Sequence, residues 1–129
     1  MVLFLSKMIF GIIYVTKTTN RLILNKMIIY NITVNIHESV HDAWMTWVNQ
    51  NFIPEMIATG KFQKARMVKV LIEEEMGGTT YSLQFETPDK ETLSRFYTDD
   101  FDRFENESKR LFGELMLTFK TELELISEH

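Results

Sequence analysis

The sequence predicts a single α+β domain with the order strand, helix, strand, strand, helix, strand. Two observations support this prediction: hydrophobic residues alternate with a period of two in four segments, and recur every three to four residues in two others. A third is the glycine pair Gly77 and Gly78 between the second and third strand-like segments. With 129 residues and 45% hydrophobic content, the chain suffices for one sizeable core.

The first strand is expected over Ile28–Ile36, where apolar and polar residues alternate. From about Ser39 the period becomes that of an amphipathic helix, whose large side chains recur at spacings of three and four. The residues of this stripe are Val40, Ala43, Trp44, Trp47, Val48 and Phe52. Pro54 has no backbone N–H, so the helix should bend or restart there, and Gly60 is placed to end it.

The second and third strands are expected to form a β-hairpin within Arg66–Glu86. Gly77 and Gly78 would be its two-residue loop, because hairpin turns need positive φ, which glycine adopts without steric cost. This loop predicts one apolar face and one mostly polar face. The expected partners are Val70 with Phe85, Ile72 with Leu83, Glu74 with Tyr81, Lys69 with Glu86, Leu71 with Gln84, and Glu73 with Ser82. The opposite charges of Lys69 and Glu86 favour this register.

The second helical region is expected to begin at Thr87, whose hydroxyl would cap it, with Pro88 in the first turn. A second capping signal at residues 98–100 divides the region into two helical pieces, and Gly113 would end the later one. Their expected apolar residues are Leu93, Phe96, Tyr97, Phe101, Phe104, Leu111 and Phe112. The last strand alternates again. We expect its apolar residues to face the helices, namely Leu115, Leu117, Phe119, Leu123 and Leu125, and its polar residues to face away, namely Thr118, Lys120, Glu122 and Glu124.

This element order is the split βαβ, ferredoxin-like arrangement βαββαβ, with a four-stranded antiparallel sheet and both helices on one face. The opposite, open face would carry polar residues and a few apolar ones. These are Asn31, Thr33, Asn35, Met67, Lys69, Leu71, Ser82, Gln84, Glu86, Met116, Thr118 and Lys120. Domains of this kind often pair through this face into a dimeric α+β barrel. Pairing would cover the apolar side chains, and the alternative is a face that is simply solvated.

The candidate ligand-binding residues lie on this open face and are Asn31, Thr33, Asn35, Lys69, Gln84 and Glu86. In a homodimer they would line a cavity between two sheets and could contact a small molecule. Two functions are open. We favour a non-catalytic homodimeric binding or interaction domain over a cofactor-independent enzyme of the monooxygenase or isomerase kind, which fold analogy alone supports. No catalytic residue is assigned and no cofactor is expected, since the one obvious base, Glu86, should be engaged by Lys69.

His37, Glu38 and His41 spell HESVH, the pattern in which two histidines one helical turn apart bind zinc. A zinc site of this type needs the whole motif inside a helix, whereas His37 follows directly on the predicted strand. We therefore expect a solvated strand-to-helix turn and no metal. Trp44 and Trp47 are expected to be core residues rather than pocket residues.

The charge of the chain argues against nucleic acid as a partner, because a net charge of -4 with both signs interspersed provides no basic stripe. The absence of cysteine excludes disulfides and thiolate chemistry, and is compatible with a cytoplasmic location.

The first 26 residues contain no acidic residue, and their apolar run is interrupted by Ser6 and Lys7. The run is too short for a membrane span and lacks a cleavage pattern. We expect the natural chain to start at Met27. Residues 1–26 would then be a leader or a wrongly included upstream extension, and they could form an apolar helix or strand. A targeting segment is the alternative. Residues 27–129 would form the ferredoxin-like domain, without a membrane segment.

Four segments resemble a bacterial family of domains of unknown function with a ferredoxin-like fold. They are MIIYNITVNI at residues 27–36, IPEMIATGKF at 53–62, EEEMGGTTYSLQF at 73–85 and FKTELELI at 119–126. The resemblance covers nearly all of residues 27–127, supports Met27 as the start and implies no activity. A histidine often precedes the IPE segment in that family. Phe52 stands there in this chain, so no role of that histidine carries over.

Overall fold

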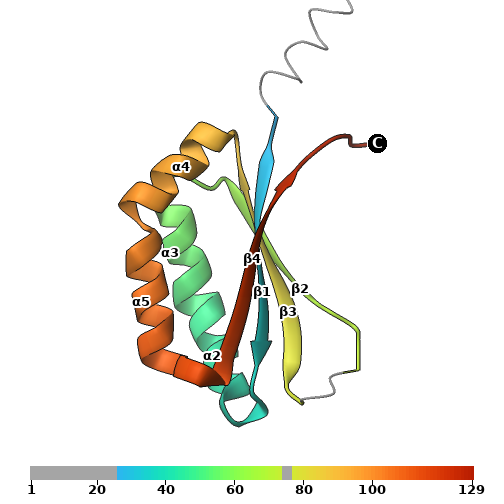
Figure 1. Cartoon of the computed structure of the whole chain (residues 1–129), viewed down its shortest axis with the longest axis vertical. Helices are drawn as coiled ribbons and strands as arrows, with labels where there is room; N and C mark the ends of the chain where they lie inside the picture. Colours follow the sequence, from blue (N-terminus) through green and yellow to red (C-terminus); the bar gives the residue numbers. More distant parts are fainter. Residues whose placement is uncertain (1–25, 74–76) are drawn as a thin grey trace, which may run out of the picture.

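The computed structural model describes residues 26–73 and 77–129, and it contains one antiparallel sheet with helices packed on one side (Figure 1). The strands are β1 (Ile28–Ile36), β2 (Lys64–Lys69), β3 (Thr79–Thr87) and β4 (Met116–Glu124). They lie in the order β2-β3-β1-β4, so β1 and β3 are central and the other two are edges. The predicted ferredoxin-like α+β arrangement is confirmed.

The first helical region is continuous but irregular. It comprises a 3-10 turn (Glu38–Val40), α2 (His41–Trp47), a π-helical segment (Val48–Phe52) and α3 (Ile53–Ala58). The predicted irregularity at Pro54 is confirmed. It takes the form of π-helical turns before the proline, which lies in the first turn of α3, where its missing N–H does least harm. Gly60 follows with a φ of 78°, as expected for a residue that ends a helix.

The second helical region consists of two pieces, as predicted. They are α4 (Lys90–Asp99) and α5 (Phe101–Phe112), followed by a 3-10 turn (Gly113–Leu115). The predicted cap was wrong: the Asp89 carboxylate accepts a hydrogen bond from the Thr92 backbone N–H at 2.8 Å. Thr87 belongs instead to β3, where it is fully buried. Leu111, expected to be buried, is 40% exposed.

The core is an aromatic layer between the sheet and the helices. The Tyr30 ring lies 5.5 Å from Phe96 and 6.0 Å from Phe62, and the rings of Phe62 and Phe96 are 4.9 Å apart. The alternate residues of β1 that face the helices are all buried. The helices contribute Trp44, Val48, Phe52, Met56, Leu93, Phe96, Phe104 and Phe112 to this layer. The predicted stripe of the first helix is therefore largely confirmed, although Ala43 is exposed.

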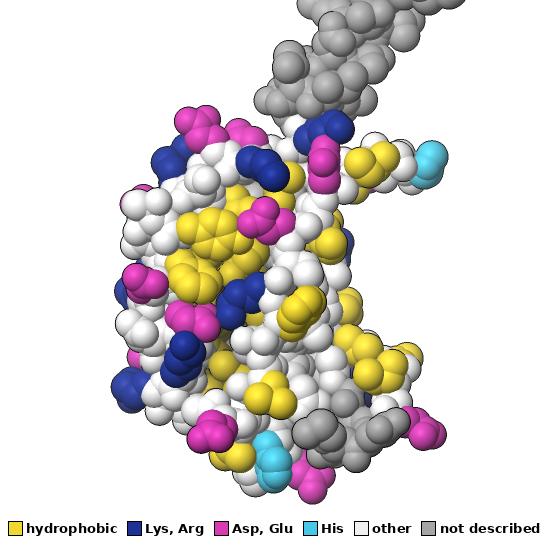
Figure 2. Space-filling model, in the orientation of Figure 1, with side chains coloured by type: hydrophobic (Ala, Val, Ile, Leu, Met, Phe, Trp, Pro, Cys, Tyr) yellow, Lys and Arg dark blue, Asp and Glu magenta, His cyan; other side chains and the backbone are white. Residues whose placement is uncertain are grey.

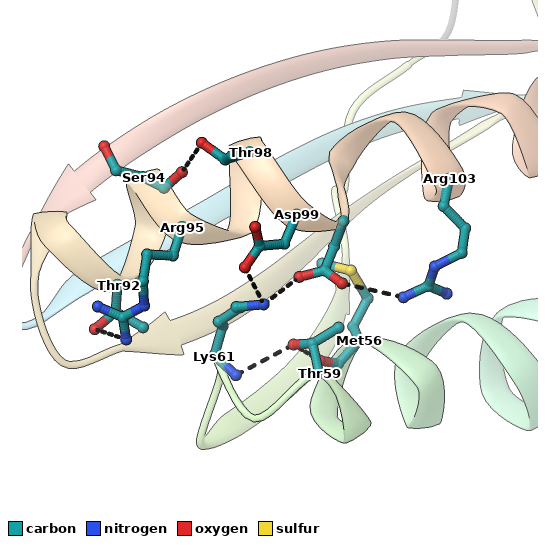
Figure 3. A network of polar contacts seen from close by, with 10 residues as sticks. Met56, Thr59, Lys61, Thr92, Ser94, Arg95, Thr98, Asp99 and Arg103 are labelled. Carbon is teal, nitrogen blue, oxygen red and sulfur yellow. Dashed lines mark hydrogen bonds and ion pairs between the residues drawn. The ribbon is translucent and has the colours of Figure 1, made fainter.

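A polar network joins the end of the first helical region to the junction of α4 and α5 (Figure 3). Lys61 Nζ lies 2.6 Å from Asp100 Oδ2 and 3.2 Å from Asp99 Oδ2, while Arg103 donates to Asp100 at 3.2 Å. The Lys61 and Asp100 side chains are only 15% and 12% exposed. The hydrogen bond to Asp100 raises the pKa of Lys61. The network holds the two helical regions together over the core.

The predicted register of β2 and β3 was wrong. Phe85 lies opposite Ala65 rather than Val70, and Tyr81 lies opposite Lys69 rather than Glu74, which lies outside the described residues. The shift is five residues. Because an odd shift exchanges the two faces of a strand, Met67 and Lys69 are on the helix side of the sheet.

The connection between these strands is longer than the predicted two-residue loop, because β2 ends at Lys69 and β3 begins at Thr79. Gly77 and Gly78 do have positive φ values, 80° and 81°. A Cβ on Gly78 would lie 2.8 Å from the Ile36 carbonyl oxygen, so the close approach itself requires glycine. Leu71 is 86% exposed in this connection and belongs to neither predicted face. Ile72 is also exposed, at 60%, so these two apolar residues after Lys69 do not enter the core.

The faces of β4 are also the reverse of the prediction. Leu117 and Phe119 lie opposite Asn35 and Thr33, on the side of the sheet away from the helices. The polar alternates, with Met116, point toward the helices, and they are Thr118, Lys120, Glu122 and Glu124. Partners on the helices make this orientation stable, because Lys120 contacts Glu105 of α5 at 3.1 Å.

Candidate functional site

The open face of the sheet carries a hydrogen-bond network that crosses all four strands. Arg66 Nε of β2 donates to Gln84 Oε1 of β3 at 2.8 Å, and Gln84 Nε2 donates to Ser82 Oγ at 3.2 Å. Ser82 Oγ donates to Asn31 Oδ1 of β1 at 2.5 Å. Asn31 Nδ2 donates to Thr121 Oγ1 of β4 at 3.1 Å. Mutual bonding orients these side chains and gives the centre of the face a defined pattern of donors and acceptors.

Most of the predicted binding residues are brought together on this face. They are Asn31, Thr33, Asn35, Gln84 and Glu86. Lys69 is not among them, because it lies on the helix side opposite Tyr81. Sequence reasoning missed Arg66, which takes the expected role of Lys69: its Nη1 lies 3.5 Å from Glu86 Oε2, and the Glu86 side chain is 15% exposed. The sequence predicted an ion pair between Glu86 and a basic residue of β2, but the wrong register gave Lys69 as the partner instead of Arg66.

Large apolar side chains border the polar network on the edge strands. On β4, Leu117 is 55% exposed, Phe119 68% and Leu123 43%. On β2, Val68 lies opposite Ser82 and is 42% exposed. Monomeric soluble proteins rarely expose contiguous apolar patches larger than a few hundred Å², and the row on β4 is the larger of the two groups. The open face thus has a polar centre with apolar edges, which differs from the mostly polar face that the sequence predicts.

A second candidate site is a cavity of about 40 Å³ on the other side of the sheet, between β1, β4 and the helices. The apolar residues of its wall are Tyr30, Ile32, Val34, Trp44, Trp47, Val48, Phe52, Met56, Leu83, Phe96, Phe101, Phe104 and Met116. Four further residues are polar, namely Glu105, Ser108, Thr118 and Lys120. Figure 2 shows hydrophobic side chains reaching the surface between the helices and β4, beside acidic and basic ones.

The polar side of this cavity is an ion pair between β4 and α5. Lys120 Nζ lies 3.1 Å from Glu105 Oε1 and 3.3 Å from its Oε2, and it donates to Thr118 Oγ1 at 3.2 Å. The Lys120 and Glu105 side chains are 26% and 24% exposed. Sequence reasoning missed these residues because it placed Lys120 on the open face. Assigning the polar alternates of the last strand to the helix side would have found them.

Two tyrosines lie beside this ion pair. Burial raises the pKa of Tyr30, and nearby Tyr97, Glu105 and Glu122 raise it further. The pKa of Tyr97 is raised by burial and by its hydrogen bond to Glu122 Oε2 at 2.5 Å. Both phenols therefore keep their protons at neutral pH, and Tyr97 donates its proton to Glu122.

The histidines of the HESVH motif face different partners. His37 caps the 3-10 turn, since its Nδ1 accepts a hydrogen bond from the Ser39 backbone N–H at 3.0 Å. His41, expected in solvent, has its Nε2 2.7 Å from the Tyr81 hydroxyl and its Nδ1 3.1 Å from Asp42 Oδ1. Tyr81 is one strand away from the turn, so sequence spacing gave no signal of this contact.

The fold places the chain among ferredoxin-like α+β domains, and structural comparison shows this at low sequence identity. A dimeric ferredoxin-like protein from an uncultured marine organism matches with a TM-score of 0.59 and 13% identity, over 81% of this chain and 99% of the other. A hydroxynitrile lyase from Passiflora edulis matches with a TM-score of 0.56 and 12% identity, over 79% and 96%. An ethyl tert-butyl ether D (EthD) family protein from Bacillus halodurans C-125 matches with a TM-score of 0.55 and 12% identity, over 73% and 96%.

The chain belongs to the family described as Domain of unknown function (DUF4286), whose model matches residues 27–126. The resemblance inferred from the four sequence segments is thereby confirmed. A search of curated proteins finds no match. Within residues 26–73 and 77–129, no helix has both the length and the apolar character needed to cross a membrane.

Proposed function

We propose that this chain is a homodimeric binding domain in which the open faces of two copies meet and their polar networks line the space between the sheets. The observation that supports this proposal is the exposed apolar row of Leu117, Phe119 and Leu123 beside the network. A second copy would remove this row from water, which favours association by about 25 cal/mol per Å² of apolar surface.

The pattern of the face fits a second copy of the same chain. Most polar residues of the face lie on the central strands β1 and β3, with Arg66 and Thr121 on the edge strands, and the exposed apolar residues lie on the edges. A two-fold axis along or across the strands places polar centre on polar centre and edge on edge, so the surface is self-complementary. The similar solved structure described as a dimeric ferredoxin-like protein supports the same assembly.

Binding is favoured over catalysis by the state of Glu86. A general base needs a carboxylate that can reach a substrate proton. Here Arg66 lies against Glu86, and Gln84 beside it is bonded to the same arginine. The network is instead suited to hold a small polar molecule by several oriented hydrogen bonds.

Sedimentation equilibrium of the full chain tests the dimer. We expect a mass of twice 15.3 kDa at micromolar concentration, and a strict monomer at that concentration would remove the proposal. Thermal-shift screening of polar metabolites tests ligand binding. Asn31→Ala should abolish the shift given by any hit, whereas Asn106→Ala on the exposed side of α5 should leave it unchanged.

A further inference from the structure

The cavity is separate from the proposed dimer interface, because the strand residues that line it face the helices and not the open side of the sheet. Figure 1 shows the helices packed on that one side. Its volume of about 40 Å³ exceeds the roughly 10–15 Å³ that a single water needs. Away from its polar side at Glu105, Ser108, Thr118 and Lys120, water would find few partners among the aromatic and aliphatic walls, and spaces of that kind accept apolar molecules. The space therefore suits an apolar group better than solvent.

The hydroxyl of Tyr30 provides a polar anchor in this cavity. Tyr30 is 1% exposed and lines the cavity. Its hydroxyl is not a sealed unpartnered group, because among residues 26–73 and 77–129 the one fully enclosed side-chain oxygen without a partner is Thr87 Oγ1. The Tyr30 hydroxyl can therefore be reached from the cavity, and a tyrosine hydroxyl in an apolar wall readily donates to an oxygen placed beside it. A ligand oxygen at this point would accept that hydrogen bond.

The charges around the cavity limit what it can bind. Lys120 and Glu105 neutralise each other, and the two carboxylate oxygens and Thr118 occupy the ammonium group. An anion would be repelled by Glu105, and a cation would compete with Lys120. Either charge would also lose its hydration among aromatic walls. The balance favours an uncharged ligand.

The backbone beside the cavity is irregular. The π-helical segment supplies Val48 and Phe52 to the wall, next to Trp47, whose ring lies 5.1 Å from Phe52. π-Helical turns within α-helices are rare and frequently occur at functional sites. This position is consistent with a site rather than with a packing defect.

From these observations we propose that the cavity binds a small uncharged molecule, mainly apolar, with one hydroxyl or carbonyl oxygen that accepts a hydrogen bond from Tyr30. The apolar part lies among the tryptophan and phenylalanine rings, and the oxygen lies on the side of Glu105 and Lys120. The proposal is independent of the homodimer.

Tryptophan fluorescence of the full chain provides the test, because the sequence contains only two tryptophans and both line the cavity. Cyclohexanol is the probe, with cyclohexanecarboxylate and cyclohexylammonium as charged molecules of similar shape. We expect cyclohexanol to change the emission with a Kd on the order of 1 mM, and both charged probes to bind at least about tenfold more weakly.

Three variants locate the binding. Tyr30→Phe should weaken cyclohexanol about fivefold, the effect of one hydrogen bond, and Ser108→Met, which fills the cavity, should abolish binding. Ser94→Met on the exposed side of α4 is the matched control and should bind as the natural chain does. Circular dichroism checks that each variant folds. An emission that does not respond to cyclohexanol, or equal affinity in the natural chain and Ser108→Met, would overturn the proposal.

Discussion

Replacing Phe119 by aspartate is the most direct perturbation of the proposed dimer. Phe119 is 68% exposed on β4 and lies opposite Thr33, beside the polar network. Full burial of a large apolar side chain contributes roughly 1.5–3 kcal/mol, and the two-fold symmetry counts the contribution twice. Scaled by the exposed fraction, the two phenylalanines contribute about 2–4 kcal/mol to association. Their loss should raise the dimer Kd roughly 30- to 700-fold.

The aspartate adds to this loss, because two carboxylates would be desolvated in the interface. Analytical ultracentrifugation over a concentration series measures the Kd, and circular dichroism confirms that the variant folds. Leu111→Asp is the matched control: Leu111 is also an exposed apolar residue, but it lies on α5, on the other side of the sheet. A Phe119→Asp Kd within about threefold of the natural value would refute the reasoning, as would an equal effect of Leu111→Asp.

Two further predictions concern stability. Asp89→Ala should lower the free energy of unfolding in urea at pH 7 by about 1 kcal/mol, because it removes the cap on the Thr92 backbone N–H. The same hydrogen bond lowers the Asp89 pKa. The stabilisation by Asp89 is therefore present above about pH 3.9 and is lost as the pH falls through the lowered pKa. Lys61→Met should destabilise the fold at neutral pH. Since Asp100 raises the Lys61 pKa, this difference persists up to about pH 10.4 and disappears as the pH rises through the raised pKa, and a constant difference up to pH 12 would contradict it.

The sequence was sufficient for the element order because each element has a clear hydrophobic period. β1 is a central strand and the first helix packs on the sheet, so each must have one apolar face. Their hydrophobic patterns therefore allow a single assignment of the buried face. β4 is an edge strand with Leu117 and Phe119 on one face and Lys120 on the other. The usual rule puts the leucine side inside. It fails here because Glu105 of α5 provides a partner for Lys120, and no local pattern reports that partner.

The register of β2 illustrates the second limit. Val70, Leu71 and Ile72 are the most apolar run of the hairpin, and matching them to β3 through a Gly–Gly turn gave a self-consistent but wrong pairing. On the helix side of β2, Ala65 and Met67 pack partly buried against the core, whereas Lys69 is exposed. How far a helix covers a strand is a tertiary property, so the sequence predicted the polar residues of β1 and β3 on the open face but not those contributed by β2.

The alternation along β1 has a consequence for how this family can change in length. Neighbouring residues of β1 face opposite sides of the sheet: Tyr30 lines the cavity on the helix side, and Asn31 belongs to the hydrogen-bond network on the open face. Inserting or deleting one residue in this strand would move every side chain beyond that point to the other face of the sheet. Relatives should therefore keep β1 and β3 constant in length, and natural insertions should gather in the connection that follows Lys69.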